Sequence, residues 1–271
     1  MNETAPKLQV LIVCYSRRLE NMDGAQLPAV AGVEYIICCQ NPDNLDLEAA
    51  ADRLRRVDVK VFFNPGRGIS NNRNTSLALA SAPYLLLGDD DLFYCPDGLT
   101  AIIEAFDADP ELDIITARIE SGDGERIYPP AAHDLKRPFR FYNPISFEIA
   151  LRRSAWQAAG VRFSPLLGVN APYLGAGEED VFFHRLLGKV RGARFVDALL
   201  CRHPGTTTSG REGATPRVLR SKGACLRVIY GNFEALARFP VEAWRSPAPF
   251  VKALWCYLQG YCYSIRHRRQ I

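Results

Sequence analysis

The stretch at residues 84–91, YLLLGDDD, constrains the fold most, because an apolar run ends there at three consecutive carboxylates. Tyr84 and the leucines at 85–87 are apolar on both faces of an extended chain, which predicts a strand buried on both sides, as in a parallel sheet. The acids then lie at the carboxyl end of this strand, the edge where open α/β sheets bind ligands. We therefore expect an α/β protein with a site at this edge.

The three acids allow two interpretations. Side chains alternate along an extended chain, so Asp89 and Asp91 are expected to point one way and Asp90 the other. Such a D-x-D pair suits a hard cation, Mg²⁺ or Mn²⁺. A solvated acidic turn after a strand explains a bare DDD equally well, and the residues alone do not separate the two interpretations.

Alternating strand and helix patterns surround this stretch. β-branched and apolar runs predict strands at 8–15, 33–39 and 59–63, and an amphipathic pattern predicts a helix at 45–56. This order indicates a parallel sheet with crossover helices. Downstream we expect a helix at 98–107, strands at 112–118 and 193–200, a strand or helix at 145–152, and an irregular polar excursion at 119–143.

Composition narrows the class of protein. A chain of 271 residues can bury a large core without disulfides, and its eight cysteines are scattered without a CxxC pair, as in a reduced compartment. We expect a cytoplasmic protein, since no secretory pattern opens the sequence and no apolar run approaches the roughly 20 residues of a spanning helix. A net charge of +3 is too small to indicate nucleic acid as a partner.

The segment at residues 64–80, NPGRGISNNRNTSLALA, leads directly into the acidic strand. It predicts a glycine and proline loop followed by a helix with Ser70 or Asn71 as its cap. Arg73 would lie in the first turns of this helix at the rim of the sheet, where a guanidinium can meet a diphosphate. A solvated or salt-bridged arginine is the alternative.

The order of these motifs resembles family 2 inverting glycosyltransferases of the GT-A fold. Their nucleotide-sugar half has a glycine loop, an arginine–asparagine pair, an apolar strand, a D-x-D and then a proline. The matching positions here are Gly66 or Gly68, Arg73 with Asn74, Asp89 with Asp91, and Pro96.

The resemblance implies a Rossmann-like mixed central sheet with flanking helices. It places a GT-A catalytic domain at residues 1–210, with a nucleotide-sugar half at 1–100 and an acceptor half at 101–210. A helical C-terminal extension would occupy 211–271.

The resemblance also implies a donor site and a metal site. Asp89, Asp91 and His203 would hold Mn²⁺ or Mg²⁺, although a lone histidine is also common as a structural residue. Glycine, serine and threonine at 205–210 would add donors for phosphate. The base-reading aspartate of the family is missing after the second strand, so UDP, dTDP and GDP sugars all stay open. The residues expected to bind the donor are Tyr15, Asn41, Asp43, Gly68, Arg73, Asp89 and Asp90.

A second acidic cluster, Glu178, Glu179 and Asp180, opens a predicted helix behind Gly175 and Gly177. The helix dipole favours carboxylates in a first turn, which would explain one of them. By the resemblance, one acid is the general base that deprotonates the acceptor hydroxyl. We favour Asp180 over Glu179, and the run of three acids leaves the register open by one residue.

The C-terminal part is helical, basic and aromatic. Residues 246–271 resemble a segment that lies at a membrane interface, which would make the protein peripheral at the inner face of the cell membrane. Packing on the catalytic domain or on another subunit of a homo-oligomer is the alternative. The residues that suggest the interface are Trp255, Tyr257, Tyr261, Tyr263, Arg266, His267, Arg268 and Arg269.

Together these features predict a metal-dependent inverting glycosyltransferase of hexosyltransferase type. It would move a sugar from a nucleotide-diphosphate sugar to a hydroxyl of a glycan or lipid-linked acceptor, in bacterial polysaccharide assembly. A nucleotidyltransferase of related fold is one alternative, but the expected basic glycine-rich signature is absent after Tyr15. A catalytically inactive GT-A-like subunit that binds a partner is the other.

Overall fold

The computed structural model describes residues 5–122, 124–139, 142–205 and 212–271. These divide into two compact units. The first unit comprises Met1–Arg67, Asn72–Val161 and Arg185–Gly205, and the second comprises Gly68–Asn71, Arg162–His184 and Thr206–Ile271. Residues 162–184 thus group with the C-terminal helices.

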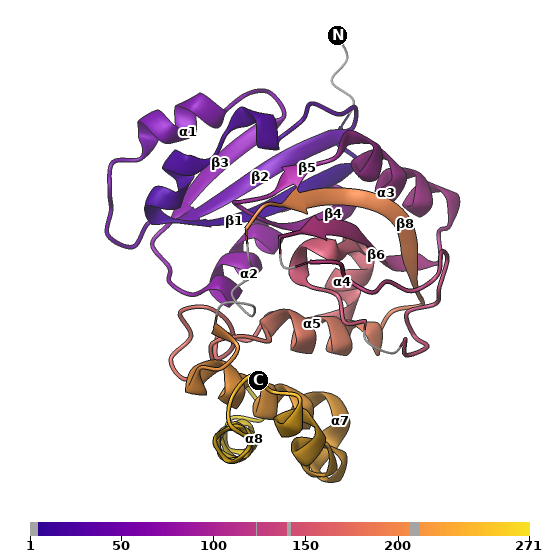
Figure 1. Ribbon diagram of the computed structural model, residues 1–271. Helices are drawn as coiled ribbons and strands as arrows, with labels where there is room; N and C mark the ends of the chain where they lie inside the picture. Colours follow the sequence, from indigo (N-terminus) through magenta and orange to yellow (C-terminus); the bar gives the residue numbers. More distant parts are fainter. Residues whose placement is uncertain (1–4, 123, 140–141, 206–211) are drawn as a thin grey trace. The chain divides into compact units, whose positions relative to one another are not determined.

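The first unit is built on one eight-stranded sheet in the order β3-β2-β1-β4-β7-β6-β8-β5 (Figure 1). Strands β1, β2, β3 and β4 are mutually parallel, as predicted from their apolar runs. The strands are β1 (Leu8–Tyr15), β2 (Val33–Gln40), β3 (Val59–Asn64), β4 (Tyr84–Asp89), β5 (Phe93–Tyr94), β6 (Leu112–Ser121), β7 (Ile149–Arg152) and β8 (Gly192–His203).

The other half of the sheet is mixed. β7 runs antiparallel to both β4 and β6, β6 pairs with β8 in parallel, and β5 is antiparallel to β8. Strand β4 therefore has a parallel neighbour on one side and an antiparallel neighbour on the other. The predicted mixed central sheet with flanking helices is confirmed.

The sheet is buried on both faces, which explains why its central strands are apolar at most positions; the buried Gln9 and Glu34 are exceptions that hydrogen-bond to each other. In β1, the seven residues from Leu8 to Cys14 are all buried. Leu8, Val10 and Ile12 share one core cluster with residues of α1 (Glu48–Leu54) and α3 (Pro96–Ala108). Alternate side chains such as Leu11 and Val13 face the opposite side and are also buried.

Several local predictions need correction. Helix α2 (Ile69–Leu79) begins before the predicted caps, so Ser70 lies inside it, and the Ser70 hydroxyl donates to the Leu167 carbonyl at 2.8 Å. The strand or helix expected at 145–152 is a 3-10 turn, η3 (Ser146–Glu148), followed by β7. A short helix, α4 (Arg153–Ala159), follows it and was not predicted.

The predicted irregular excursion at 119–143 starts later than expected, because β6 continues to Ser121. Beyond it, the described residues at 122, 124–139 and 142–143 form no helix. An isolated bridge pairs Asp134 with Arg194.

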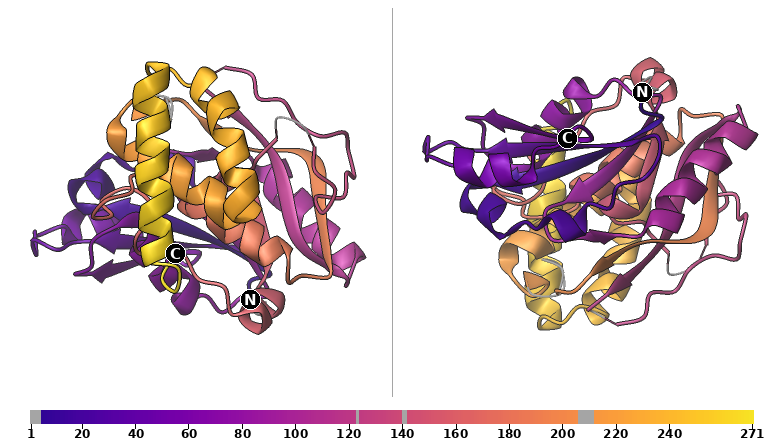
Figure 2. Two further views of the ribbon diagram at one scale, coloured as in Figure 1. Left: turned by 90° about the horizontal axis from the view of Figure 1, so that it is seen from below. Right: turned by 90° about the horizontal axis from the view of Figure 1, so that it is seen from above.

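The second unit contains most of α5 (Glu178–Leu187) and all of α7 (Pro216–Trp244) and α8 (Phe250–Arg266). α7 is kinked at Gly231, where φ is 79°. α7 and α8 lie side by side (Figure 2). Two glycines permit their close approach, since a Cβ at Gly223 would lie 2.1 Å from the Tyr257 carbonyl oxygen. A Cβ at Gly260 would clash with the Arg220 carbonyl oxygen. Across the described residues, no helix is both long and apolar enough to cross a membrane.

We predict that Gly88→Ala destabilises the first unit by about 1–3 kcal/mol through overpacking. A Cβ at position 88 in β4 would lie only 2.1 Å from the Tyr94 hydroxyl oxygen. That hydroxyl is buried without a hydrogen-bond partner among the described residues, so Tyr94→Phe alone should cost little. Urea unfolding of both single variants and the double variant measures the coupling.

In this cycle Tyr94→Phe removes the atom that clashes, so the double variant should recover most of the stability lost in Gly88→Ala. Strictly additive losses in the double variant would contradict the packing assigned to Gly88.

Candidate functional site

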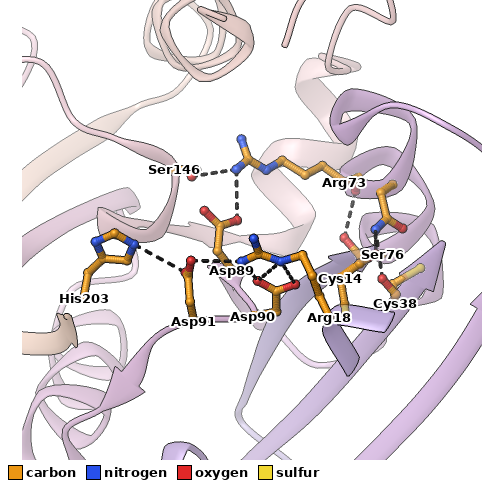
Figure 3. Close-up of polar contacts among 11 residues, drawn as sticks. Cys14, Arg18, Cys38, Arg73, Ser76, Asp89, Asp90, Asp91, Ser146 and His203 are labelled. Carbon is orange, nitrogen blue, oxygen red and sulfur yellow. Dashed lines mark hydrogen bonds and ion pairs between the residues drawn. The ribbon is translucent and has the colours of Figure 1, made fainter. Parts of the chain in front are cut away.

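The acidic row lies at the carboxyl end of β4, as predicted, and arginines hold its members in place (Figure 3). β4 ends at Asp89, so the alternation expected of an extended chain stops there. Asp89 contacts Arg73, whereas the guanidinium of Arg18 bridges Asp90 and Asp91. The three carboxylates are thus divided between two guanidiniums.

Arg73 of α2 is buried, with 3% of its surface exposed. Its Nη2 donates to Asp89 Oδ1 at 3.1 Å and to the Ser146 hydroxyl at 2.7 Å. Burial raises the pKa of Asp89, and the charge of Arg73 opposes that rise while the neighbouring Asp91 and Asp90 add to it. Arg73 therefore compensates a carboxylate that the fold has partly withdrawn from water.

Arg18 lies in η1 (Ser16–Asn21), directly after β1. Its Nε donates to Asp90 Oδ2 at 2.7 Å and to Oδ1 at 3.0 Å, and its Nη2 donates to Asp91 Oδ2 at 3.0 Å. The pKa of Arg18 is raised, chiefly by its hydrogen bonds to Asp90. Asp90 is buried in this contact, and its backbone carbonyl accepts from Gln26 Nε2 at 3.2 Å. Arg18 was not among the predicted site residues.

His203 is the last residue of β8, and its ring is 6% exposed. Nε2 lies 3.5 Å from Asp91 Oδ1, and the ring stacks on Phe147 with centroids 5.7 Å apart. Nδ1 is buried and finds no hydrogen-bond partner in the described part of the chain. The structure therefore brings together Asp91 and His203, which the sequence placed more than a hundred residues apart.

These contacts show whether the residues present could hold a metal ion. Among the described residues, no three His, Cys, Asp or Glu side chains gather closely enough to hold a metal by themselves. Mg²⁺ and Mn²⁺ are, however, often held by one or two protein ligands together with substrate phosphates. The carboxylate of Asp91 and the imidazole of His203 fit such a shared site, and Asp89 would join it while its Oδ1 keeps the contact with Arg73.

The predicted donor-binding loops also contain Arg67, which was not among the predicted site residues. Arg67 donates to the Tyr15 hydroxyl at 2.9 Å and to Asp43 Oδ1 at 2.6 Å, so it joins the ends of two predicted binding segments. Asn41 instead closes its own loop, since its amide accepts from Leu45 N at 2.9 Å and donates to Leu45 O at 2.8 Å. Gly68 has a φ of 91°, which favours glycine.

A buried asparagine ties the strand ends to α2. Asn72 donates to the carbonyl oxygens of Cys14 at 3.0 Å and Cys38 at 2.9 Å, at the ends of β1 and β2. It accepts from Asn64 Nδ2 at 3.0 Å, at the end of β3. One side chain thus connects three parallel strands to the helix that carries Arg73.

In the second unit, Glu178, Glu179 and Asp180 occupy the first turn of α5, as predicted. Glu178 is buried, and its carboxylate packs so closely on Gly168 that a Cβ there would lie 2.8 Å from Oε2. Glu179 and Asp180 are half-buried, and Glu179 Oε2 is without a hydrogen-bond partner among the described residues.

The glycine loop before α5 rests on α7. The Ser221 hydroxyl accepts from the backbone N–H groups of Gly175 at 2.8 Å and Ala176 at 3.1 Å. Gly177 has a φ of 82°, and a Cβ there would lie 2.4 Å from Cys225 Sγ. The acidic turn is therefore positioned by α7. Of the phosphate-binding residues predicted at 205–210, only Gly205 is described, and 206–210 lie outside the described residues.

Comparisons with known proteins agree with this architecture. Residues 33–167 match the sequence pattern of the protein family described as Glycosyl transferase family 2. A comparison with curated proteins gives no match.

Solved structures share the fold. S. aureus TarS 1–349 matches in complexes with UDP (TM-score 0.59) and UDP-GlcNAc (TM-score 0.60), each at 13% identity, over 88% of this chain and 70% of TarS 1–349. A mycobacterial protein matches at 15% identity, with a TM-score of 0.56, over 81% of this chain and 74% of its own. At these identities the likeness establishes the fold alone.

We predict that Arg73→Gln lowers the free energy of unfolding by about 3 kcal/mol near neutral pH, because the charge of Asp89 loses its partner. The pKa of Asp89 should rise further, so the folded variant takes up a proton more readily than the unfolded chain does. Its deficit relative to wild type should therefore shrink as the pH falls and Asp89 is protonated.

Ser146→Ala is the matched control, since it removes one hydrogen bond from Arg73 but keeps the ion pair. It should cost about 1 kcal/mol with no added pH dependence. Urea unfolding of the three proteins at about pH 5 and about pH 7.5 makes the comparison. An Arg73→Gln deficit that is equal at both pH values would contradict the assigned role.

Proposed function

This chain belongs to glycosyl transferase family 2 through residues 33–167, and from that premise we propose that it is a metal-dependent inverting glycosyltransferase. It transfers a hexosyl group from a nucleotide-diphosphate sugar to a hydroxyl of a glycan or lipid-linked acceptor. The observation that carries the proposal is the acidic row at the end of β4, held by Arg18 and Arg73 beside His203.

Arg18 suits contact with a diphosphate, and Arg73 suits a supporting position beside it. A guanidinium matches phosphate oxygens with paired donors, and both arginines already lie at the carboxyl edge of the sheet. Arg18 is half exposed, so it can exchange part of its contact with Asp91 for a phosphate without leaving the buried Asp90. Arg73 is enclosed and fixed by Ser146, which suits a role in setting the position of Asp89.

Asp91 and His203, with Asp89, would hold Mn²⁺ or Mg²⁺ together with the phosphates of the donor. A bound divalent cation neutralises the charge that grows on the leaving diphosphate. Stacking on Phe147 holds the ring of His203, and the contact with Arg18 holds the carboxylate of Asp91.

We assign the nucleotide contacts to the loop that Arg67 joins. Tyr15 and Asp43 lie on either side of its guanidinium, at the ends of β1 and β2. Asn41 would contribute to nucleotide binding through the shape of its loop, and Gly68 would contribute through its backbone. Asp90 would act through Arg18 because its carboxylate is buried in that pair.

The acceptor hydroxyl needs a base as its oxygen attacks the anomeric carbon from the face opposite the leaving group. We assign this role to Asp180, with Glu179 as the alternative, in the first turn of α5. Glu178 is the weakest candidate because its carboxylate is buried against Gly168. Direct displacement inverts the configuration at the anomeric carbon.

A donor screen tests the proposal. The protein is incubated with UDP, dTDP and GDP sugars, with and without Mn²⁺, and the released nucleoside diphosphate is measured. Turnover of one donor class that depends on the cation is the expected result. Absence of both turnover and binding with every donor would favour the inactive partner-binding subunit, and NMR of the product's anomeric proton tests the inversion.

For the base, we predict that Asp180→Asn lowers kcat by about 10²–10⁴-fold while donor affinity stays within about twofold of wild type, because general-base catalysis is lost and donor binding is not. Glu179→Gln is the matched comparison and should retain most of the activity. If Glu179→Gln abolished transfer and Asp180→Asn did not, the assignment would move by one residue.

A further inference from the structure

The second unit exposes large apolar side chains on its two long helices. Phe233 and Trp244 of α7 are 90% and 83% exposed, and Val251 and Trp255 of α8 are 77% and 62% exposed. We call these four side chains the apolar surface. More than half of the exposed large apolar residues in the described part of the chain lie in α7, α8 or at their ends.

Helical periodicity gathers these residues on common faces. Phe233 and Trp244 both follow the kink at Gly231 and are eleven residues, about three turns, apart, so they project from one side of α7. Val251 and Trp255 are one turn apart on α8. α7 and α8 pack side by side (Figure 2), and their facing sides form a shared core. The four residues of the apolar surface are outside that core and exposed.

The tyrosines that suggested a membrane interface in the sequence lie elsewhere. Tyr257 is fully buried in the core between α7 and α8. Tyr263 stacks on Tyr173 with ring centroids 4.6 Å apart, within the same unit. Of the predicted aromatic belt, Trp255 alone has a large exposed fraction among the described residues. The exposed surface instead includes Phe233 and Trp244 of α7, which lie before residue 246.

The charge around the apolar surface is mainly positive. No aspartate or glutamate occurs between residues 243 and 271, whereas the chain as a whole has a net charge of only +3. The two acids of α7 nearest the surface are paired, Glu234 with Arg238, and Glu242 with Lys222 and, at 3.8 Å, with Arg245. The cations of this segment, all exposed, are Arg245, Lys252, Arg266, Arg268 and Arg269.

From this pattern we infer that the apolar surface docks on an anionic lipid bilayer. Tryptophan and phenylalanine enter the interfacial layer of a bilayer, and the flanking cations attract anionic headgroups. A second copy of the chain is a poorer partner, because a two-fold contact would bring these cations together. A soluble polyanion would match the charge but leave Phe233, Trp244 and Trp255 in water.

Vesicle binding by the full chain tests this inference, and it is independent of the proposed activity because no donor or acceptor is present. Vesicles of phosphatidylcholine, with or without about 30% phosphatidylglycerol, are sedimented with the protein. The chain has three tryptophans, so Trp156→Phe leaves Trp244 and Trp255 as the only indole reporters. We expect co-sedimentation with the anionic vesicles and a blue shift of the emission of this variant.

Two pairs of variants separate the apolar and charged contributions. Trp244→Ser with Trp255→Ser should weaken binding about tenfold or more, and Val57→Ser, which removes a 78% exposed side chain elsewhere, should not. Arg245→Glu with Lys252→Glu should weaken binding by about fivefold or more per residue. Arg17→Glu is the matched charge control, since that side chain is also exposed and pairs with Glu20.

Three results would overturn the inference. The first is the absence of binding to anionic vesicles with unchanged tryptophan emission. The second is binding that survives the Trp244 and Trp255 substitutions. The third is a dimer in analytical ultracentrifugation that the same substitutions dissociate while vesicle binding is absent, which would assign the apolar surface to a second copy of the chain.

Discussion

Compensation of the carboxylate charge at the end of β4 is the interaction on which the rest of the site depends. Asp89 and Asp90 are largely removed from water, and burying carboxylates without partners costs several kcal/mol per ion. Arg73 and Arg18 provide the partners, one from α2 and one from the turn after β1. The sheet order makes this compensation available, since β1 and β4 are neighbours in parallel and Val13 lies opposite Asp89.

The same ion pairs hold the acidic row in place at the carboxyl edge of the sheet. α2 buries polar side chains where most helices bury apolar ones: Asn72 connects the strand ends, and Arg73 contacts both Asp89 and Ser146. Arg18 is the more adaptable partner because it is half exposed and contacts two carboxylates. Arg73 is therefore the enclosed partner of Asp89, and Arg18 is the half-exposed partner of Asp90 and Asp91.

The parallel strands were predictable from sequence because apolar runs report burial on both faces directly. The polar contacts were not, since Arg18 reaches Asp90 and Ser146 reaches Arg73 only because elements that are distant in sequence lie side by side. The contacts of Asn72 were not predicted, because the buried face of a helix is recognised by the spacing of its apolar residues. A polar residue on that face adds nothing to this pattern. Within α8, Trp255 points outward and Tyr257 inward although both are aromatic, so composition located the segment but not its exposed face.

Direct binding of a nucleoside diphosphate tests the central claim, that the acidic row and its arginines form a donor site. UDP, dTDP and GDP are titrated calorimetrically into wild type and Asp91→Asn, with and without Mn²⁺. The comparison separates the contribution of the cation to the affinity from that of the protein alone. We predict that one nucleoside diphosphate binds wild type more tightly with Mn²⁺, and that Asp91→Asn loses this gain. Equal affinities in the two proteins with Mn²⁺, or no binding of any nucleoside diphosphate, would contradict the account.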